Sequence, residues 1–450
     1  MADEEVSAGT ATQPVMNRWL VVVGAILIQL CLGAIYAWSV FTPSLKAEPY
    51  NFTTTQTQWV FAVGLATFAV VMVLAGKWQA AAGPTIVARV GGLVLGLGYV
   101  AARFVGPSFP GILVTIGLVG GAGIGLAYVV PIAVGVKWFP DKKGLITGLA
   151  VAGFGFGALI WVKLAGSWGH LIDDHGVSDV FMYYGIVFFV MVMIGSIWMK
   201  NPPPGWQPTG WDPATGSGGA AAGTGLQLTP AEVLRTPQFY MLWVMFIIGA
   251  LAGLMVIGII KLFGIDALQA RAGLTAVEAS AKAGTAMAVF YAIFNGLGRI
   301  VWGAASDQIG RKTALVLMLL FQGIIMLAFF YMGGHVALLY LGAAIIGFNF
   351  GGNFALFPAA TADFFGNKNV GRNYGWMFTA YGVGGIVGPI MAGTFSDAGR
   401  EAVEAATSQA DKLAAGLDAW FPAFIIAGVA CLVAAALGLM LRPPKPKPAQ

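Results

Sequence analysis

Residues 298–312 read GRIVWGAASDQIGRK. They contain the end of one apolar stretch, residues 284–305, and the polar residues that precede the next, residues 314–332. A helix that crosses the hydrocarbon core of a bilayer needs about 20 predominantly apolar residues, and both stretches are of that length. The intervening DQIGRK is short and polar, with a glycine that permits a turn and two basic residues that favour the cytoplasmic face of a membrane. The segment therefore predicts a turn between two membrane-spanning helices.

The rest of the chain repeats this alternation of long apolar stretches and short polar turns. Hydrophobic residues make up 58% of the 450 residues and charged residues 10%, whereas soluble domains contain about 25% charged residues. So little charge would leave a water-exposed surface uncovered, which excludes a soluble protein. We predict an all-α membrane protein with twelve transmembrane helices, near residues 18–41, 58–76, 85–105, 110–136, 145–166, 179–199, 238–262, 284–305, 314–332, 336–358, 374–395 and 419–441.

A segment without a packing face divides the chain into two parts. Residues 201–225 read NPPPGWQPTGWDPATGSGGAAAGTG, a composition that is typical of a flexible linker. We therefore expect an N-terminal six-helix bundle at residues 1–199, a cytoplasmic linker at 200–236 and a C-terminal six-helix bundle at 237–450. The N-terminus is acidic and has no basic segment before the first apolar stretch, so we expect no cleaved signal peptide.

Basic residues in short loops predict the orientation of the chain. With the N-terminus inside, thirteen Lys and Arg residues fall on the inner side and five on the outer side. The inner residues are Arg18, Lys77, Lys142, Lys143, Lys200, Arg235, Arg311, Lys312, Lys368, Arg372, Arg442, Lys445 and Lys447; the outer ones are Lys46, Arg271, Lys282, Arg400 and Lys412. We therefore expect a multi-pass membrane protein with both termini in the cytoplasm.

The two halves of the sequence match each other at a nearly constant offset. Trp138 and Phe139 correspond to Phe364 and Phe365 at an offset of 226, and several glycines correspond at 226 or 227. Such a match predicts two six-helix halves in parallel repetition, with the substrate site near the middle of the membrane between them.

Arg299 is the strongest candidate for a binding residue. It lies inside an apolar stretch, well before the polar end marked by Asp307, and its counterpart in the first half is Met72. A charged side chain in the membrane core is costly and usually faces a cavity, and the planar guanidinium group binds a carboxylate through two parallel hydrogen bonds. Asn295, one helical turn earlier, can orient Arg299 or bind the substrate. The alternatives are a structural pairing of Arg299 with a helix end and a packing role for Asn295.

Several segments resemble one branch of the major facilitator superfamily. Residues 298–312 resemble its loop signature, and WFPDKKGLITGLAVAG at 138–153 resembles the fifth-span signature of the monocarboxylate transporter family. Residues 234–239, 355–358 and 372–375 are similar to the related bacterial oxalate:formate antiporter family. The resemblance implies a major facilitator fold, transport by alternating access and a substrate-binding arginine at Arg299. Together with the count of basic residues, it also implies a location in the plasma membrane, the inner membrane of a bacterial cell.

The sequence departs from this family pattern at two places. The first-half counterpart of residues 303–312 reads GKWQAAAGPT, at 76–85, and it lacks the acid and the arginine. We therefore expect any gating clamp there to be weaker or differently built. The position of Asn295 looks like that of an aspartate that takes part in proton coupling in the mammalian monocarboxylate transporters. Because this chain has an amide there, the proton role does not carry over to it.

The resemblance also implies which aromatic residues line the pocket, because most of spans 1, 4, 5, 10 and 11 face the cavity in this superfamily. The candidates are Tyr36, Tyr128, Phe154, Phe350, Phe354, Phe378 and Tyr381. The alternative is that these rings pack against lipid or other helices. Lys261, near the outer end of the seventh span, is a weaker candidate that would attract anions to the mouth of the pocket.

Tyr381 bears on the class of substrate. In the oxalate transporter pattern the matching position is a lysine, and a dianion calls for two cations. With Arg299 as the one central cation, we expect a secondary active transporter of small monocarboxylates, such as lactate or pyruvate, with protons as the expected coupling ion. An oxalate:formate-type anion exchanger, with Lys261 as the second cation, is the alternative. A membrane receptor or sensor that binds without transport is the alternative from another class.

Other classes of function lack their signatures in this sequence. Cys31 and Cys431 lie far apart in apolar spans, and His170, His175 and His335 are scattered over outer loops, which argues against a metal site. The sequence contains no Gly-Lys-Ser/Thr phosphate-binding motif, which argues against transport driven by ATP. We expect no enzymatic activity, no cofactor and no nucleic-acid partner. The expected partners are a small carboxylate, protons and the lipid bilayer, and the expected oligomeric state is a monomer.

Overall fold

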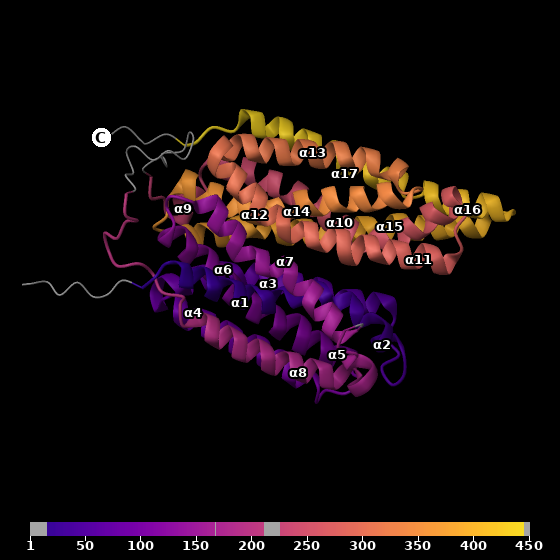
Figure 1. The fold of residues 1–450 in the computed structure, drawn as a ribbon, viewed down its shortest axis with the longest axis horizontal. Coiled ribbons are helices and arrows are strands. Elements are labelled where there is room, and N and C mark those ends of the chain that lie inside the picture. The colour runs from indigo at the N-terminus through magenta and orange to yellow at the C-terminus, as the bar shows by residue number, and fades with distance from the viewer. Residues whose placement is uncertain (1–15, 167, 211–225, 445–450) are drawn as a thin grey trace, which may run out of the picture.

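The computed structural model describes residues 16–166, 168–210 and 226–444, and this part of the chain consists of helices joined by short connections. The expected absence of a signal peptide concerns residues 1–15, and the centre of the expected linker is 211–225; both lie outside the described residues. The helices of the first half, from indigo to magenta, form one group, and the orange and yellow helices of the second half form another beside it (Figure 1).

The first half contributes six long helical segments and the short helix α2 (Thr42–Lys46). The long segments are α1 (Trp19–Leu32) with η1 (Gly33–Val40), α3 (Thr54–Ala82), α4 (Pro84–Ala102), α5 (Phe109–Ile112) with η2 (Leu113–Gly120) and α6 (Gly121–Trp138), α7 (Lys143–Ala165) and α8 (Leu171–Ser196).

The second half begins with the short α9 (Pro230–Val233) and contributes six further segments. These are α10 (Pro237–Ala272), α11 (Ala276–Thr285) with η3 (Ala286–Tyr291) and α12 (Ala292–Ile309), α13 (Arg311–Met332), α14 (Val336–Phe365), α15 (Val370–Ala405), and α16 (Gln409–Asp418) with α17 (Phe421–Met440). Within the described residues, eleven segments are long and apolar enough to cross a membrane, and α15 is the twelfth long helix. The predicted all-α membrane architecture with twelve helices is confirmed.

Several helices are longer than the spans expected from hydropathy. The seventh span was expected to end at residue 262, but α10 continues to Ala272, and α15 continues to Ala405 instead of ending at 395. Apolar runs report only the part of a helix that lies in hydrocarbon. Polar residues extend these helices beyond it, and hydropathy therefore underestimates their length.

The internal repeat is visible in the backbone. Gly83 separates α3 from α4 with a φ of 86°, and Gly310 separates α12 from α13 with a φ of 84°. These positions differ by 227 residues, and only glycine adopts such a φ without strain. Pro131 within α6 and Pro358 within α14 are a second matching pair. The two halves therefore share local geometry as well as helix order.

The end of the molecule where the linker attaches, called the linker-side end below, is closed by ionic contacts between the halves. Asp307 at the end of α12 accepts hydrogen bonds from the backbone N–H groups of Gly144, at 2.9 Å, and Leu145, at 2.8 Å. These N–H groups belong to the first turn of α7, where the helix dipole favours a carboxylate. Asp307 therefore pairs with the end of a neighbouring helix, and that helix belongs to the other half.

A buried carboxylate reinforces this closure. Asp363 near the end of α14 is 5% exposed and pairs with Lys143 at 2.7 Å and with Arg311 at 2.6 Å. Arg311 also pairs with Asp307 at 2.6 Å, so the four charges form one network. The network joins α7 of the first half to α12, α13 and α14 of the second.

The corresponding seam between α3 and α15 has no such network among the described residues. At the position that matches Ser306 stands Gln79, which is 6% exposed and whose side-chain oxygen lacks a hydrogen-bond partner in the described chain. That oxygen faces Gly371 in the first turn of α15. The clamp in the first half is therefore built differently, without charge, as its sequence suggests.

Glycines let α12 lie close to its neighbours on both sides. A Cβ atom added at Gly148 of α7 would overlap the carbonyl group of Arg299, and one added at Gly351 of α14 would overlap that of Asn295. Close approach of this kind is typical of small residues at helix interfaces in membranes. It places α12 tightly between α7 of the first half and α14 of the second.

Candidate functional site

Arg299 is fully buried between the two halves of the molecule. Its Nε donates to Asn295 Oδ1 at 3.0 Å, and its Nη1 donates to the carbonyl oxygen of Val151 at 2.9 Å. The guanidinium carbon lies 4.1 Å from the ring centre of Phe354 and 5.4 Å from that of Phe154. The expected contact between Asn295 and Arg299 is present, and it fixes the guanidinium group in one orientation.

The second terminal nitrogen of Arg299 has no such partner. Nη2 is buried, and no group in the described part of the chain accepts a hydrogen bond from it. A buried donor without an acceptor is costly, and a charged one especially so. None of the described acidic residues pairs with this arginine, so the remaining N–H groups are available for an anion.

Aromatic rings from both halves enclose the guanidinium group. Tyr128 of α6 lies with its ring centre 5.4 Å from that of Phe154 and 5.2 Å from that of Phe378 of α15. Phe378 in turn lies 4.8 Å from Tyr381, and Phe354 of α14 lies 5.4 Å from Tyr381. The repeat counterparts Tyr128 and Phe354 therefore line the same chamber, as do the counterparts Phe154 and Tyr381.

Two tyrosines join the halves on the side of the chamber away from the linker. The hydroxyl groups of Tyr36 of η1 and Tyr381 of α15 hydrogen-bond to each other. Tyr36 also packs edge-on against Phe154, with ring centres 5.0 Å apart. This pair covers the chamber toward the end of the molecule opposite the linker, and we call it the outer tyrosine pair.

A cavity of about 100 Å³ lies directly beyond the outer tyrosine pair. Tyr36 and Asn295 line its deep end, and Val162 and Met287 lie farther along α7 and η3. The π-helical turns of η3 (Ala286–Tyr291) form part of its wall, and π-turns within helices often occur at functional sites. The cavity thus lies between α7 of the first half and α10, η3 and α12 of the second, and it reaches Asn295, the residue that holds Arg299.

Two of the predicted residues lie at the edge of this arrangement. Phe350 packs against Gly253 of α10 and lies 5.3 Å from Phe354 and 6.2 Å from Tyr291, ring centre to ring centre, so it supports the chamber from behind. Lys261 is exposed on α10, one helical turn beyond Ile257, which lines the cavity. A role for Lys261 at the mouth stays a prediction.

The structure brings two further residues into the chamber that the sequence did not single out. Phe68 of α3 lies 4.9 Å from Tyr128 and 4.9 Å from Phe378, measured between ring centres. Tyr374 of α15 is fully buried and lies 5.7 Å from Phe378. Tyr374 could have been found from the spacing of residues 374, 378 and 381, which places all three on one face of a helix.

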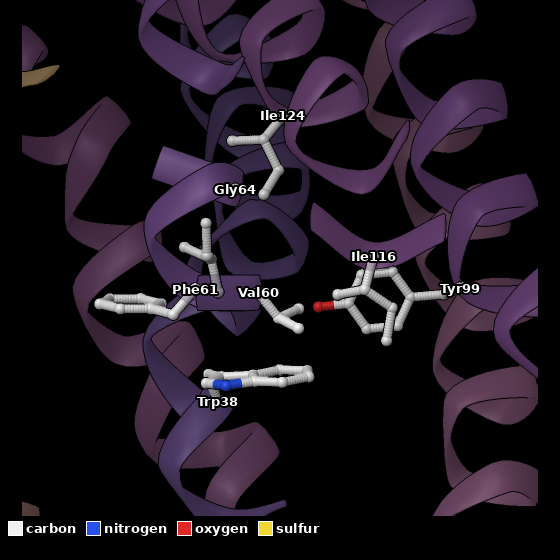
Figure 2. Close-up of a pocket in the computed structure, with 8 residues that line it drawn as sticks. Trp38, Val60, Phe61, Gly64, Tyr99, Ile116 and Ile124 are labelled. Carbon is white, nitrogen blue, oxygen red and sulfur yellow. The ribbon is translucent and has the colours of Figure 1, made fainter. Parts of the chain in front are cut away.

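Two other cavities among the described residues differ from this site in their chemistry. Figure 2 shows a small one of about 10 Å³ inside the first half, where Trp38, Val60, Tyr99 and Ile116 converge. It holds about one water molecule and contains no charged group. A groove of about 580 Å³ between α12, α13 and α14 is lined almost entirely by apolar side chains. Neither cavity offers a cation to a substrate.

Two six-helix groups that meet around a buried, unneutralised arginine are the arrangement expected of a membrane transporter built from repeats. The family model of the Major Facilitator Superfamily matches residues 26–290 and 268–450. This chain belongs to the major facilitator superfamily. Its fold agrees with that of the solved proton:xylose symporter XylE, with a TM-score of 0.65 over 95% of this chain and 96% of the symporter at 12% identity.

Three relatives are similar to this transporter over most of their length. It is 31% identical to the uncharacterised MFS-type transporter YhjX of Escherichia coli, over 82% of this chain and 86% of that protein. It is 28% identical to the oxalate:formate antiporter of Oxalobacter formigenes, over 84% and 85% of the two chains. It is 25% identical to the apicoplast pyruvate carrier 1 of Toxoplasma gondii, over 83% of each. The predicted family is thereby confirmed.

Proposed function

We propose that this transporter carries small monocarboxylates such as lactate or pyruvate across the membrane by alternating access. The observation that carries the proposal is Arg299, a fully buried cation with an unpaired Nη2 inside an aromatic chamber. A carboxylate would neutralise the guanidinium group, and the surrounding phenyl rings would accept a short apolar tail. The similarity to a pyruvate carrier supports the same class of substrate.

The number of cations favours a monocarboxylate over a dicarboxylate. Among the described residues of the chamber, Arg299 is the one charged side chain, and Tyr381 contributes a hydroxyl group that is already bonded to Tyr36. A dianion would leave one negative charge without a partner in a site from which water is excluded. An exchanger for oxalate and formate, which the similarity to the oxalate:formate antiporter would suggest, is the second candidate. It would need Lys261 to move inward as the second cation.

We propose further that the linker-side end faces the cytoplasm, in the plasma membrane, because the basic residues of short loops gather there. The ionic network around Asp363 would then close the cytoplasmic side, and the cavity of about 100 Å³ would lead to the outside. Substrate would enter past the outer tyrosine pair, bind to Arg299 and leave once α7 separates from α12 and α14.

Uptake of labelled L-lactate and pyruvate into proteoliposomes tests the proposal. The intact protein should accumulate label, and Arg299→Gln should abolish accumulation. Arg271→Gln is a matched control, because Arg271 also donates to a backbone carbonyl, that of Phe330 at 2.7 Å, and lies 4.6 Å from an aromatic ring centre, but far from the chamber. Equal loss of uptake in both variants would show that Arg299 has only a structural role.

The same vesicles decide how transport is coupled. Among the described residues that surround Arg299 no carboxylic acid is present, so a coupled proton would have to travel with the substrate or over the tyrosines. Proton symport predicts uptake driven by an inward proton gradient into empty vesicles. Anion exchange predicts no uptake without internal carboxylate, and exchange of lactate for internal oxalate or formate would favour the second candidate. Binding without any flux under either condition would favour a receptor.

A further inference from the structure

Tyr374 is a buried residue of the chamber whose hydroxyl group has no partner. It lies in the first turns of α15, on the linker side of Phe378 and Tyr381, and it is fully buried. Its hydroxyl group faces that of Tyr128 of α6, which in turn faces Arg299. Although the three groups are close enough to interact, the contacts of Tyr128 with Arg299 and with Tyr374 do not reach the geometry of a full hydrogen bond. Nη2 of Arg299 and the two hydroxyl groups have no other partner within the described part of the chain.

The three unpaired groups are all hydrogen-bond donors that converge on one place. They are Nη2 of Arg299 and the hydroxyl groups of Tyr128 and Tyr374. Buried polar groups in proteins nearly always have partners, and leaving several unpaired at one point is costly. An ionised carboxylate has two oxygen atoms with about four sites for accepting hydrogen bonds, and it offers no competing donor. It is therefore the ligand that this set of groups fits.

We propose that Tyr374 completes a three-donor slot for the substrate carboxylate, together with Arg299 and Tyr128. The inference rests on the proposed function and assigns the contacts of the carboxylate within it. Phe378, next along the same face of α15, then borders the apolar part of the substrate. Tyr374 is a binding residue of the second half; it lies within the family-like residues 372–375, but the resemblance did not place it among the pocket candidates.

The slot also explains how binding would be coupled to closure of the two halves. Tyr128 belongs to the first half, whereas Tyr374 and Arg299 belong to the second. A carboxylate that accepts from all three groups ties α6 to α15 on the linker side of the chamber. The outer tyrosine pair differs, because Tyr36 and Tyr381 already bond to each other without any ligand. The linker-side pair, Tyr128 and Tyr374, needs the anion to join its members.

The test is equilibrium binding of sodium pyruvate and sodium L-lactate to the purified full-length transporter, measured by calorimetry and by ligand-induced thermal stabilisation. The variants are Tyr374→Phe, Tyr128→Phe, the double variant and Arg299→Gln. Tyr99→Phe is the matched control, because Tyr99 is a buried tyrosine of the first half that borders the small apolar cavity in Figure 2, away from the chamber.

We expect Tyr374→Phe to weaken binding about tenfold or more, since a hydrogen bond to a charged group is lost. The unliganded protein should unfold at the same or a slightly higher temperature, because the substitution removes an unpaired buried hydroxyl group. The double variant should lose less than the product of the two single effects, because both hydroxyl groups act on one carboxylate. Tyr99→Phe should bind like the unmodified protein.

Two results would overturn the inference while leaving the proposed function intact. One is a Tyr374→Phe variant that binds within about twofold of the unmodified protein while Arg299→Gln binds nothing. The other is a Tyr374→Phe variant that unfolds at a lower temperature without ligand, which would show that the hydroxyl group supports the fold. Failure of the unmodified protein to bind either monocarboxylate would overturn the proposed function itself, and the slot with it.

Discussion

Lys143 of α7 and Asp363 of α14 form an ion pair at 2.7 Å that joins the first half of the transporter to the second. Both side chains are largely buried, with 12% and 5% of their surfaces exposed. Asp363 keeps a second partner, Arg311, inside its own half. The bond to Lys143 can therefore break when the halves separate while Asp363 remains neutralised.

This arrangement predicts different effects for the two partners. Lys143→Met should leave the fold intact but favour the state that is open on the linker side, because Asp363 still pairs with Arg311. Asp363→Asn should lower the stability of the protein by roughly 3–5 kcal/mol, because it leaves the largely buried Lys143 without a counter-charge and Arg311 with Asp307 alone. Thermal unfolding measures the second effect. Maleimide labelling of Ala133→Cys measures the shift toward the open state. Ala133 of α6 is buried against Gly371 of α15 in the other half, so the cysteine becomes accessible when the linker-side end opens. Equal labelling of Ala133→Cys in proteins that carry Lys143 and in proteins that carry Lys143→Met would contradict the prediction.

Gly148 predicts an effect on the equilibrium between open and closed states. A methyl group at this position would overlap the carbonyl group of Arg299 across the two halves. Gly148→Ala should therefore disfavour the state closed on the linker side and increase labelling of Ala133→Cys. Gly157→Ala is the control, because its methyl group would overlap the carbonyl oxygen of Leu30 within the first half. That variant should unfold at a lower temperature without more labelling, and the reverse pattern would refute the assignment.

The outer tyrosine pair predicts a non-additive pair of substitutions. Tyr36→Phe and Tyr381→Phe each remove the same hydrogen bond, which contributes about 1 kcal/mol. Each should speed the release of bound pyruvate toward the cavity side by about fivefold, and the double variant should be no faster than either single variant. Stopped-flow measurement of dissociation checks this expectation. Additive effects would mean that the two hydroxyl groups act independently.

Tyr381 predicts a change in the charge of the preferred substrate. Tyr381→Lys places a second cation beside the chamber of Arg299, so oxalate should become an effective competitor of lactate uptake. Tyr381→Met removes the hydroxyl group without adding charge and should leave the preference for monocarboxylates unchanged. Competition of both anions against labelled lactate measures the outcome. Equal competition by oxalate in the methionine variant would show that loss of the hydrogen bond to Tyr36, and not charge, sets the preference.

The overall fold was predictable because the bilayer imposes strong rules on sequence. Apolar runs, basic loops and the repeat that relates Trp138 to Phe364 report on helices and their order without knowledge of contacts. Arg299 was predictable for the same reason, since a charge inside an apolar run stands out. Its bond to Asn295 followed from the spacing of four residues along one helix.

The contacts between distant helices could not be predicted in this way. Phe68 is an ordinary aromatic residue in an aromatic-rich span, and only packing reveals that it faces Tyr128. The spacing of Tyr374 from Phe378 and Tyr381 indicates a shared helix face, but only packing shows that this face meets Tyr128 of the other half. Asp363 lies near the end of its span and gave no sign that Lys143 of the other half would reach it. The length of α10 was underestimated because polar residues continue the helix beyond the apolar run.

The two seams between the halves of this transporter differ in how strongly they are held, as the contacts of Asp307 and Gln79 show. Asp307 holds the first turn of α7 through two hydrogen bonds, whereas the side-chain oxygen of Gln79 faces α15 without closing one. The two halves share a backbone repeat, but they need not share the contacts that close the linker-side end. If one seam is held by charged contacts, the residues of the other seam are free to change. We therefore expect the α3–α15 seam to slide easily when the transporter changes state. The α7–α12 seam, which has the stronger contacts, should determine how often the two halves separate.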